Sequence, residues 1–347
     1  MKHLTLILLA VATLLTAACD DSEKLENRID FSSPYAIEDS DDPIQHRRYE
    51  LFRDYGVSVF FNDTVSSSYV GDDFAGDPIY RYETIDLNWE FSSQSYGSIK
   101  YEFDYLTTPE EQNRALDFVD QFLSKATGAM RPFCMFLTSQ VTVWNLSQET
   151  YERPDYLTNF RTLVVAGVED YAAEQMDSLS TTILRSMVKS RVQQDANLVA
   201  RFGSVSSTEN YYGRPWVTNG ANDGLGCTCR WLTAYDGYYQ LDVNNCFTQT
   251  TIDRIMSIGI FATMEAYEEV RAELIADIGR FGFISGYSRS SKTQSPEDVS
   301  TDLGYYIDTL LAIGKEEFVN RYGGSELVME KYNMLVEYIE GELGVAI

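Results

Sequence analysis

Apolar residues recur along this chain with two different spacings, and both are clearest between residues 163 and 192. Residues 163–167 (LVVAG) form a short apolar run that is typical of a strand. From residue 179 the apolar positions instead recur at spacings of one, three and four, which places them on one face of a helix. These positions are Leu179, Ile183, Leu184, Met187, Val188 and Val192. The pattern predicts a strand followed by a long amphipathic helix.

The first half of the chain alternates between the same two kinds of segment. Thr108, Pro109 and Glu111 are typical of a helix start, because together they satisfy or remove the free N–H groups of the first turn. Gly56 is expected to end an earlier helix. Helices are expected at residues 49–55 and 108–128, strands at 57–61, 82–91 and 133–143, and a loop at 64–81.

The second half is mostly helical in its pattern. The long helix is expected to break at Gly203 and Ser204 and to lead into an aromatic loop at residues 211–216 (YYGRPW). Residues 217–247 are rich in glycine, asparagine, tyrosine and cysteine. Further helices are expected at residues 251–278, from about 297 onward, and at 325–343. Strands and long helices together predict an α+β fold.

The amino terminus is typical of an exported protein. Residues 1–18 have a basic start and a short apolar run, as in a signal peptide. The small residues before Cys19 resemble the processing site of bacterial lipoproteins, in which this cysteine is lipidated; the alternative is ordinary cleavage with Cys19 incidental. Residues 19–43 are acidic and predicted to be a tether. The sequence thus predicts an exported protein, lipid-anchored to the outer membrane at the cell surface or the periplasmic face.

Charge excludes some classes of partner. The chain has 53 acidic and 27 basic residues, which gives a formal net charge of −26. Such a surface repels the phosphates of nucleic acids and anionic lipid headgroups. We therefore expect no nucleic-acid partner, and contact with a membrane only through the lipid anchor.

Several spaced motifs resemble one known family. They are the strand and helix at 163–192, the loop YYGRPW, residues 282–288 (GFISGYS) and residues 297–301 (EDVST). This order resembles the substrate import-associated zinc metallohydrolase lipoproteins of Gram-negative glycan-uptake systems, also described as zinc-binding metallopeptidases. The resemblance covers roughly residues 40–60, 110–216 and 280–345. It implies a zincin-like domain at 44–347, in which a small mixed sheet packs on long helices, with a Cys/Tyr-rich insertion at about 217–278.

The chain departs from this family at the metal site. The family helix carries His-Glu-x-x-His, whose histidines bind zinc and whose glutamate is the general base. The matching positions here hold Arg185, Ser186 and Lys189, and the only histidines are His3 and His46. Two cations one turn apart repel a divalent metal, and serine has no pKa suited to deprotonating water. We therefore expect no metal, no cofactor and no catalytic residue here.

The absence of the zinc ligands suggests that an ion pair takes the place of the metal. Glu297 and Asp298 match the family motif that supplies an acidic group to the metal. If the family fold holds, Arg185 or Lys189 is expected to pair with one of these carboxylates, because a buried carboxylate needs a counter-charge. The alternative is that Arg185, Lys189 and the nearby Arg191 lie on a solvated helix face.

Three cysteines lie in the inserted segment. In an oxidising compartment Cys246 is expected to form a disulfide with Cys227 or Cys229. A zinc site from the three is the less favoured alternative, because one-residue spacing is tighter than in usual zinc sites. Cys134, in a β-type run, is expected to be a buried free thiol.

Aromatic residues crowd the same segment and its border. Exposed rings beside asparagine and aspartate could stack on sugar rings, although ordinary packing is the favoured interpretation. The candidates are Tyr211, Tyr212, Trp216, Trp231, Tyr235, Tyr238 and Tyr239.

Three functions remain open from the sequence. The first is a non-catalytic, metal-free metallopeptidase-like lipoprotein that binds a glycan or a partner protein in an outer-membrane nutrient-uptake system. The second is a hydrolase, peptidase or glycosidase-like, that uses an unrecognised acidic site. The third is a structural surface lipoprotein.

Overall fold

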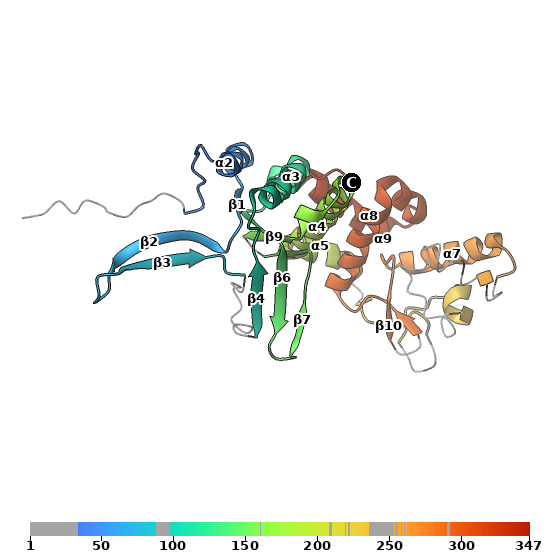
Figure 1. Cartoon of the computed structure of the whole chain (residues 1–347). Coiled ribbons are helices and arrows are strands. Elements are labelled where there is room, and N and C mark those ends of the chain that lie inside the picture. Colours follow the sequence, from blue (N-terminus) through green and yellow to red (C-terminus); the bar gives the residue numbers. More distant parts are fainter. Residues whose placement is uncertain are drawn as a thin grey trace, which may run out of the picture. The chain divides into compact units, whose positions relative to one another are not determined.

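The folded body of the protein spans Ile37–Ile347, which form one compact unit. The computed structural model describes residues 34–87, 98–159, 161–207, 210–218, 220, 223–235, 253, 256–257, 259, 261–289 and 292–347. Figure 1 shows helices together with several small sheets, which confirms the α+β class.

The helices of the described residues are long and concentrated in the second half of the chain. They are α2 (Pro43–Tyr55), α3 (Pro109–Lys125), α4 (Ala173–Gln194), α5 (Ala196–Ser207), α7 (Met264–Gly279), α8 (Val299–Tyr322) and α9 (Glu326–Val336). Short helical segments are η3 (Gly128–Met130), η4 (Val168–Asp170), η5 (Trp231–Tyr235) and η7 (Glu337–Glu342). None of the helices in the described part of the chain is both long and apolar enough to cross a membrane.

The strands of the described residues form four separate sheets. A mixed sheet has the order β1 (Ser58–Phe60), β5 (Cys134–Thr138), β9 (Thr162–Ala166), β8 (Tyr156–Thr158), and its first three strands are parallel. An antiparallel sheet joins β4 (Ile99–Asp104), β6 (Gln140–Asn145) and β7 (Thr150–Glu152). Two hairpins complete the set: β2 (Thr64–Asp72) with β3 (Pro78–Thr84), and β10 (Tyr287–Arg289) with β11 (Lys292–Gln294).

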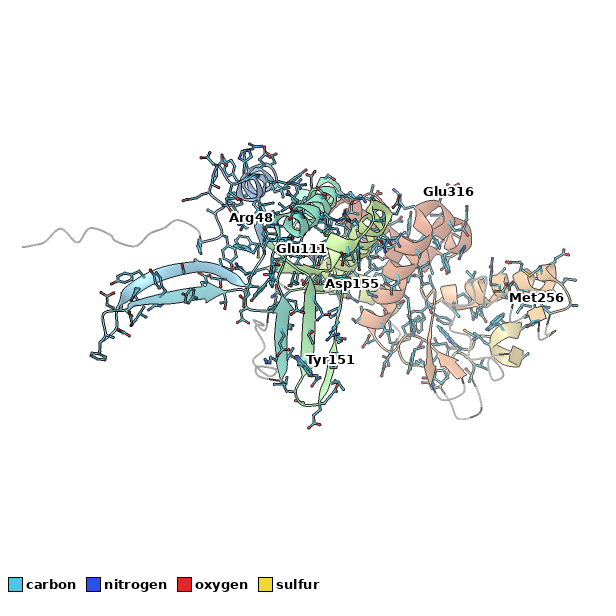
Figure 2. The ribbon with its side chains drawn as sticks, viewed as in Figure 1. Arg48, Glu111, Tyr151, Asp155, Met256 and Glu316 are labelled. Atoms are coloured by element: carbon cyan, nitrogen blue, oxygen red, sulfur yellow. The ribbon has the colours of Figure 1, made fainter. Side chains whose placement is uncertain are left out.

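One large core joins the mixed sheet to α3, α4, α8 and α9. The face of α4 that the spacing predicted is buried there: Ile183 and Val192 are completely buried, and Val188 nearly so. Helix α2 is fixed to the sheet by Arg48, which is labelled in Figure 2 and whose Nε donates a hydrogen bond of 2.7 Å to the carbonyl of Val59. The predicted strand–helix pair therefore lies at the centre of the molecule.

The predicted helix ends are confirmed where capping chemistry defines them. Gly56 follows α2 with a φ of 72°, a left-handed conformation that glycine adopts without steric cost. At the start of α3 the backbone N–H of Glu111 donates to the Thr108 hydroxyl, and the Glu111 carboxylate accepts from the backbone N–H of Thr108. Asp298 caps α8 by accepting from the N–H of Thr301 at 2.8 Å.

Three predictions about secondary structure were wrong, and a fourth was right only in part: of the strand expected at 82–91, residues 82–84 belong to β3, 85–87 are not in a strand, and 88–91 lie outside the described residues. Residues 64–81, predicted as a loop, belong to the β2–β3 hairpin, whose two faces are both solvated and so lack the apolar alternation of a half-buried strand. The run 133–143 is two strands in different sheets, divided at Ser139. The expected break at Gly203 lies inside α5, and the chain instead leaves α4 at Asp195.

A second, smaller core lies in the Cys/Tyr-rich segment and α7. It includes Trp216, Trp231, Tyr267 and Phe283, all of which are essentially buried. The predicted helix at 251–278 is interrupted: the described residues 253, 256 and 257 are helical, 259 and 261–263 are not, and α7 begins at Met264, where the Thr263 hydroxyl accepts from the N–H of Ala266. Among the described residues, the inserted segment thus carries its own apolar cluster.

Gly203 shows why α5 contains a glycine. A Cβ at this position would lie 2.6 Å from Cγ2 of Val299 at the start of α8, which is closer than carbon atoms approach. We therefore expect Gly203→Ala to lower the free energy of unfolding by about 1–3 kcal/mol, as overpacking does elsewhere. Denaturant unfolding measures this change. Combining it with Val299→Ala should recover part of the loss, and Gly128→Ala, where the added Cβ meets nothing within 4 Å, is the matched control.

Candidate functional site

The predicted ion pair between α4 and the start of α8 is not formed. Arg185 is exposed, and Lys189 pairs instead with Asp308, at 2.7 Å, on the half-exposed surface of α8. Glu297 and Asp298 are exposed as well, so neither carboxylate needs a counter-charge from the protein. Among the described residues no ion pair joins either cation to either of these carboxylates, and the prediction was wrong on this point.

A buried ion pair does occur, one turn further into α8. Nζ of Lys331, on α9, lies 2.5 Å from Oδ2 of Asp302, and both side chains are completely buried. The ammonium also donates to Ser206 Oγ at 2.8 Å and to the carbonyl of Gly282 at 2.9 Å, so all three of its donors are used. The hydroxyl of Tyr212 donates to Asp302 Oδ2 at 3.0 Å. The pair therefore joins α5, α8, α9 and two loops.

Aromatic rings surround this ammonium. Nζ of Lys331 lies 4.7 Å from the ring centre of Phe202, 4.9 Å from that of Phe283 and 5.6 Å from that of Tyr306. Burial raises the pKa of the Asp302 carboxyl and lowers the pKa of the Lys331 ammonium, while the attraction between the two groups opposes both shifts. Because no solvent reaches the pair, we expect its role to be structural.

These residues do not fit the zinc site of the resembling family. The positions that match the family's ligands carry cations, and the carboxylate inside the core already binds an ammonium. Within the described residues, no three histidine, cysteine, aspartate or glutamate side chains are grouped so that they could hold a metal ion. We derive no metal chemistry from this arrangement.

The aromatic and cysteine candidates are mainly part of the second core. Trp216 and Trp231 are 1% exposed, so neither can stack on a sugar, whereas Tyr211 and Tyr212 are half-buried. The side chain of Tyr235, together with Tyr238 and Tyr239, lies outside the described residues.

Cys134, as expected, is a buried free thiol, and Cys227 and Cys229 are buried thiols too. Burial raises the pKa of both Cys227 and Cys229 to about 12, which makes them poor nucleophiles and poor metal ligands at neutral pH. Cys246 lies outside the described residues, so the disulfide stays a prediction.

An open cavity of about 1050 Å³ lies at the amino ends of the three parallel strands. Residues just before β1, β5 and β9 line one side of it, and the last turns of α4 line another. Its described lining includes Arg131, Arg161 and Arg191 and no aspartate or glutamate. In a chain with a net charge of −26, this is a local concentration of positive charge.

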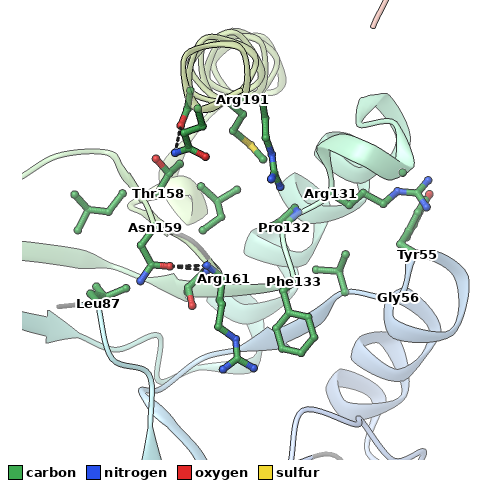
Figure 3. A pocket seen from close by; sticks show the side chains of 18 of the residues that line it. Tyr55, Gly56, Leu87, Arg131, Pro132, Phe133, Thr158, Asn159, Arg161 and Arg191 are labelled. Carbon is green, nitrogen blue, oxygen red and sulfur yellow. Dashed lines mark hydrogen bonds between the residues drawn. The ribbon is translucent and has the colours of Figure 1, made fainter. Parts of the chain in front are cut away.

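Aromatic rings contact two of these arginines (Figure 3). The guanidinium of Arg131 lies 4.9 Å from the ring centre of Tyr55, and that of Arg161 lies 4.8 Å from the ring centre of Phe133. Oδ1 of Asn159 accepts from the backbone N–H of Arg161 at 3.0 Å and so fixes the turn that presents this side chain. Because an aromatic ring carries no net charge, the contact with Tyr55 leaves the positive charge of Arg131 in place.

Arg131 also carries an unused hydrogen-bond donor. Its Nε is buried and has no partner among the described residues, and neither Arg131 nor Arg191 forms an ion pair with any of them. An orphaned buried donor is costly unless a ligand or water accepts from it. The sequence singled out Arg191 as part of a basic patch; Arg131 and Arg161 are far from it in the chain, and only the sheet brings them together.

No protein-family model, no curated protein and no solved structure matches this chain. The resemblance to zinc metallohydrolase lipoproteins therefore remains a hypothesis from the sequence motifs.

Substitutions of Lys331 and Asp302 test whether this buried pair stabilises the fold. Lys331→Met leaves the Asp302 carboxylate buried without its counter-charge, and we expect it to lower the free energy of unfolding by about 3–5 kcal/mol. Lys189→Met, which removes the exposed pair with Asp308, should cost at most about 1 kcal/mol and is the control. Adding Asp302→Leu to Lys331→Met should restore stability, and chemical denaturation of the four proteins checks the coupling. Equal effects of the two lysine changes would contradict the structural role.

A different carboxyl group should make stability depend on pH. Glu169 in η4 is 9% exposed, and its Oε2 has no hydrogen-bond partner among the described residues. Burial, with smaller contributions from Asp170 and Glu111, raises the pKa of this carboxyl. A raised folded-state pKa stabilises the protein below the unfolded pKa, and this stabilisation is lost as pH rises through the folded pKa.

We therefore expect Glu169→Gln to raise the free energy of unfolding at pH 7 by about 1 kcal/mol, since the amide removes a buried unpaired charge. The gain should shrink toward pH 4, where the wild-type carboxyl is protonated. Thermal melts at several pH values measure this difference. Glu174→Gln, at an exposed carboxyl in the first turn of α4, is the control and should change little.

Proposed function

We propose that this protein is a non-catalytic ligand-binding lipoprotein of an outer-membrane nutrient-uptake system, and that its ligand is an organic anion bound in the arginine-lined cavity. The observation that carries the proposal is a cavity with three arginines and no carboxylate among its described lining residues, in a strongly acidic chain. The negative surface repels anions elsewhere, so the positive potential of this one concave region selects where an anion binds.

The chemistry of arginine favours a particular class of ligand. A guanidinium presents planar paired donors that match carboxylate, phosphate and sulfate oxygens. The free Nε of Arg131 supports such an acceptor, and Asn159, Thr158 and Gln194 add neutral polar groups to the wall. Several separate guanidinium groups around one cavity suit a ligand with more than one anionic group.

The size of the cavity favours a ligand larger than a single metabolite. At about 1050 Å³ it lies at the upper end of the range for small-molecule sites, which is roughly 300–1,000 Å³. Phe133 is 46% exposed, and Leu157 and Met187 add apolar surface to the wall. An acidic oligosaccharide has this combination of size, repeated negative charge and apolar ring faces.

The lining also supports binding rather than catalysis. The serine, threonine and tyrosine hydroxyls of the lining would each need an adjacent base to act as a nucleophile. The groups that act as such bases are mainly histidine, carboxylates, cysteine and lysine. None of these residue types occurs among the described residues that line the cavity. The same proposal includes export through the signal peptide and anchoring at Cys19. It also includes derivation from a metallopeptidase-like scaffold that has lost its zinc ligands.

The proposal predicts that the arginines determine affinity. A galacturonic acid oligosaccharide should bind residues 20–347, whereas a neutral cello-oligosaccharide of equal length should bind at least about tenfold more weakly. Arg131→Gln and Arg191→Gln should each weaken binding of the acidic ligand about ten- to a hundredfold, because each removes a charge-assisted contact worth about 1.5–3 kcal/mol. Isothermal titration calorimetry with both ligands provides the measurement.

Arg185→Gln is the matched control, because it removes an exposed arginine of α4 that does not line the cavity. It should leave affinity unchanged. Citrate and inorganic sulfate test smaller anions of the same charge type. Binding of the acidic and neutral oligosaccharides with equal affinity, or an equal loss in the control variant, would remove the basis of the proposed site.

A further inference from the structure

The β2–β3 hairpin exposes an unusual surface. No residue from 64 to 84 is buried, although the strands are nine and seven residues long. Tyr69, Tyr80 and Tyr82 lie on one face, because Tyr69 is opposite Tyr80 and Ser67 is opposite Tyr82 in the register. Tyr82 is 62% exposed. An isolated two-stranded hairpin is marginally stable in water, so a hairpin of this kind gains from further strands.

The two outer edges of the hairpin differ in a way that selects one of them for pairing. Strand β2 has two irregularities, between Thr64 and Ser66 and between Tyr69 and Gly71, at which it carries an extra residue. Such bulges disrupt an edge and prevent further pairing. Strand β3 carries no extra residue, contains no lysine, and has its only proline at its first position. It is the kind of regular edge strand on which another strand can pair.

We propose that the occupant of this edge is a second copy of the same chain, paired antiparallel through β3 around a two-fold axis at Tyr82. In this register each Arg81 lies opposite Glu83 of the second copy, and the reverse contact forms at the same time. The two Tyr82 side chains lie opposite each other on the other face. The result is a four-stranded sheet with six tyrosines on one face.

Charge fixes the register. Arg81 and Glu83 share the face opposite the tyrosines, lie opposite Ser68 and Ser66 of β2, and form no ion pair within the described residues of their own chain. An axis at residue 81 would place two arginines against each other, and an axis at residue 83 two glutamates; both arrangements are unfavourable. Among these three positions, only the axis at Tyr82 pairs opposite charges twice.

Charge also disfavours a membrane as the occupant. The hairpin carries Asp72, Asp73, Asp77 and Glu83 against the single Arg81. Three of these carboxylates lie at the turn, beside the fully exposed Phe74, where anionic headgroups would repel them. The self-repulsion of two acidic chains is screened beyond about 8 Å at physiological salt, whereas the pairs at the edge are in direct contact.

Sedimentation velocity of residues 20–347 in 150 mM NaCl tests the proposal, because Ile37–Ile347 form one compact unit. We expect a dimer. Arg81→Glu and Glu83→Arg each convert two attractive contacts into two repulsive ones and should weaken dimerisation at least about tenfold. Combining them exchanges the charges and should restore the dimer. Arg185→Glu, an equal charge change at an exposed site outside the hairpin, should have no effect.

Disulfide trapping provides a second readout that is independent of affinity. A Tyr82→Cys variant should form an intermolecular disulfide under mild oxidation, because the axis brings the two introduced thiols together. An Ile79→Cys variant should not. A wild-type chain that stays monomeric at about 100 µM, a dimer unaffected by both charge reversals, or a monomer that binds phosphatidylglycerol vesicles through Phe74 would overturn the proposal.

Discussion

The buried contact between Lys331 and Asp302 ties together most of the second half of the chain. Removing two charges from water costs several kcal/mol each, and only direct pairing with full hydrogen bonding offsets that cost. Lys331 uses its three donors on Asp302 Oδ2, Ser206 and the Gly282 carbonyl, and Tyr212 donates to the same carboxylate oxygen, whereas Asp302 Oδ1 has no partner among the described residues. These partners come from α5, α8, α9 and two loops. Their positions are therefore interdependent, because displacing one of them leaves a buried charge incompletely paired.

This arrangement also explains why the cations of α4 lie at the protein surface and not in the core. The core carboxylate of Asp302 is paired with Lys331 of α9, and no cation of α4 pairs with it among the described residues. Lys189 pairs at the surface with Asp308, and Arg191 faces the cavity at the amino ends of the parallel strands. The cavity and the buried pair are thus separate features with opposite electrostatics. In one, an ammonium and a carboxylate are paired inside the core; in the other, three arginines line an open cavity.

The two proposed binding surfaces follow from the same imbalance of charge. A chain with a net charge of −26 has few places where an anion or a second copy can approach without repulsion. The arginine-lined cavity is one such place, because no carboxylate lies in its described wall. The edge of β3 is another, because Arg81 and Glu83 alternate in a self-complementary order. In both cases one or a few arginines determine what binds, in a chain that is otherwise strongly acidic.

The sequence by itself determined the features that depend on local contacts. The capping box of α3, the glycine stop of α2 and the buried stripe of α4 all involve residues close to one another in the chain. The α+β class followed from the two apolar spacings. A solvated hairpin such as β2–β3 escaped the prediction, because neither of its faces has a core to impose apolar alternation.

What only the tertiary structure decided is which distant residues meet. The sequence indicated that a buried carboxylate of the EDVST region would need a cation, but it placed the carboxylate at residue 297 or 298 and the cation on α4. The actual partners, Asp302 and Lys331, are 29 residues apart, and burial rather than spacing selected them. Likewise Arg131, Arg161 and Arg191 become one site only because parallel pairing aligns the amino ends of β5 and β9 beside the last turns of α4. Long-range pairing of this kind leaves no local pattern, since each residue alone is an ordinary arginine or lysine.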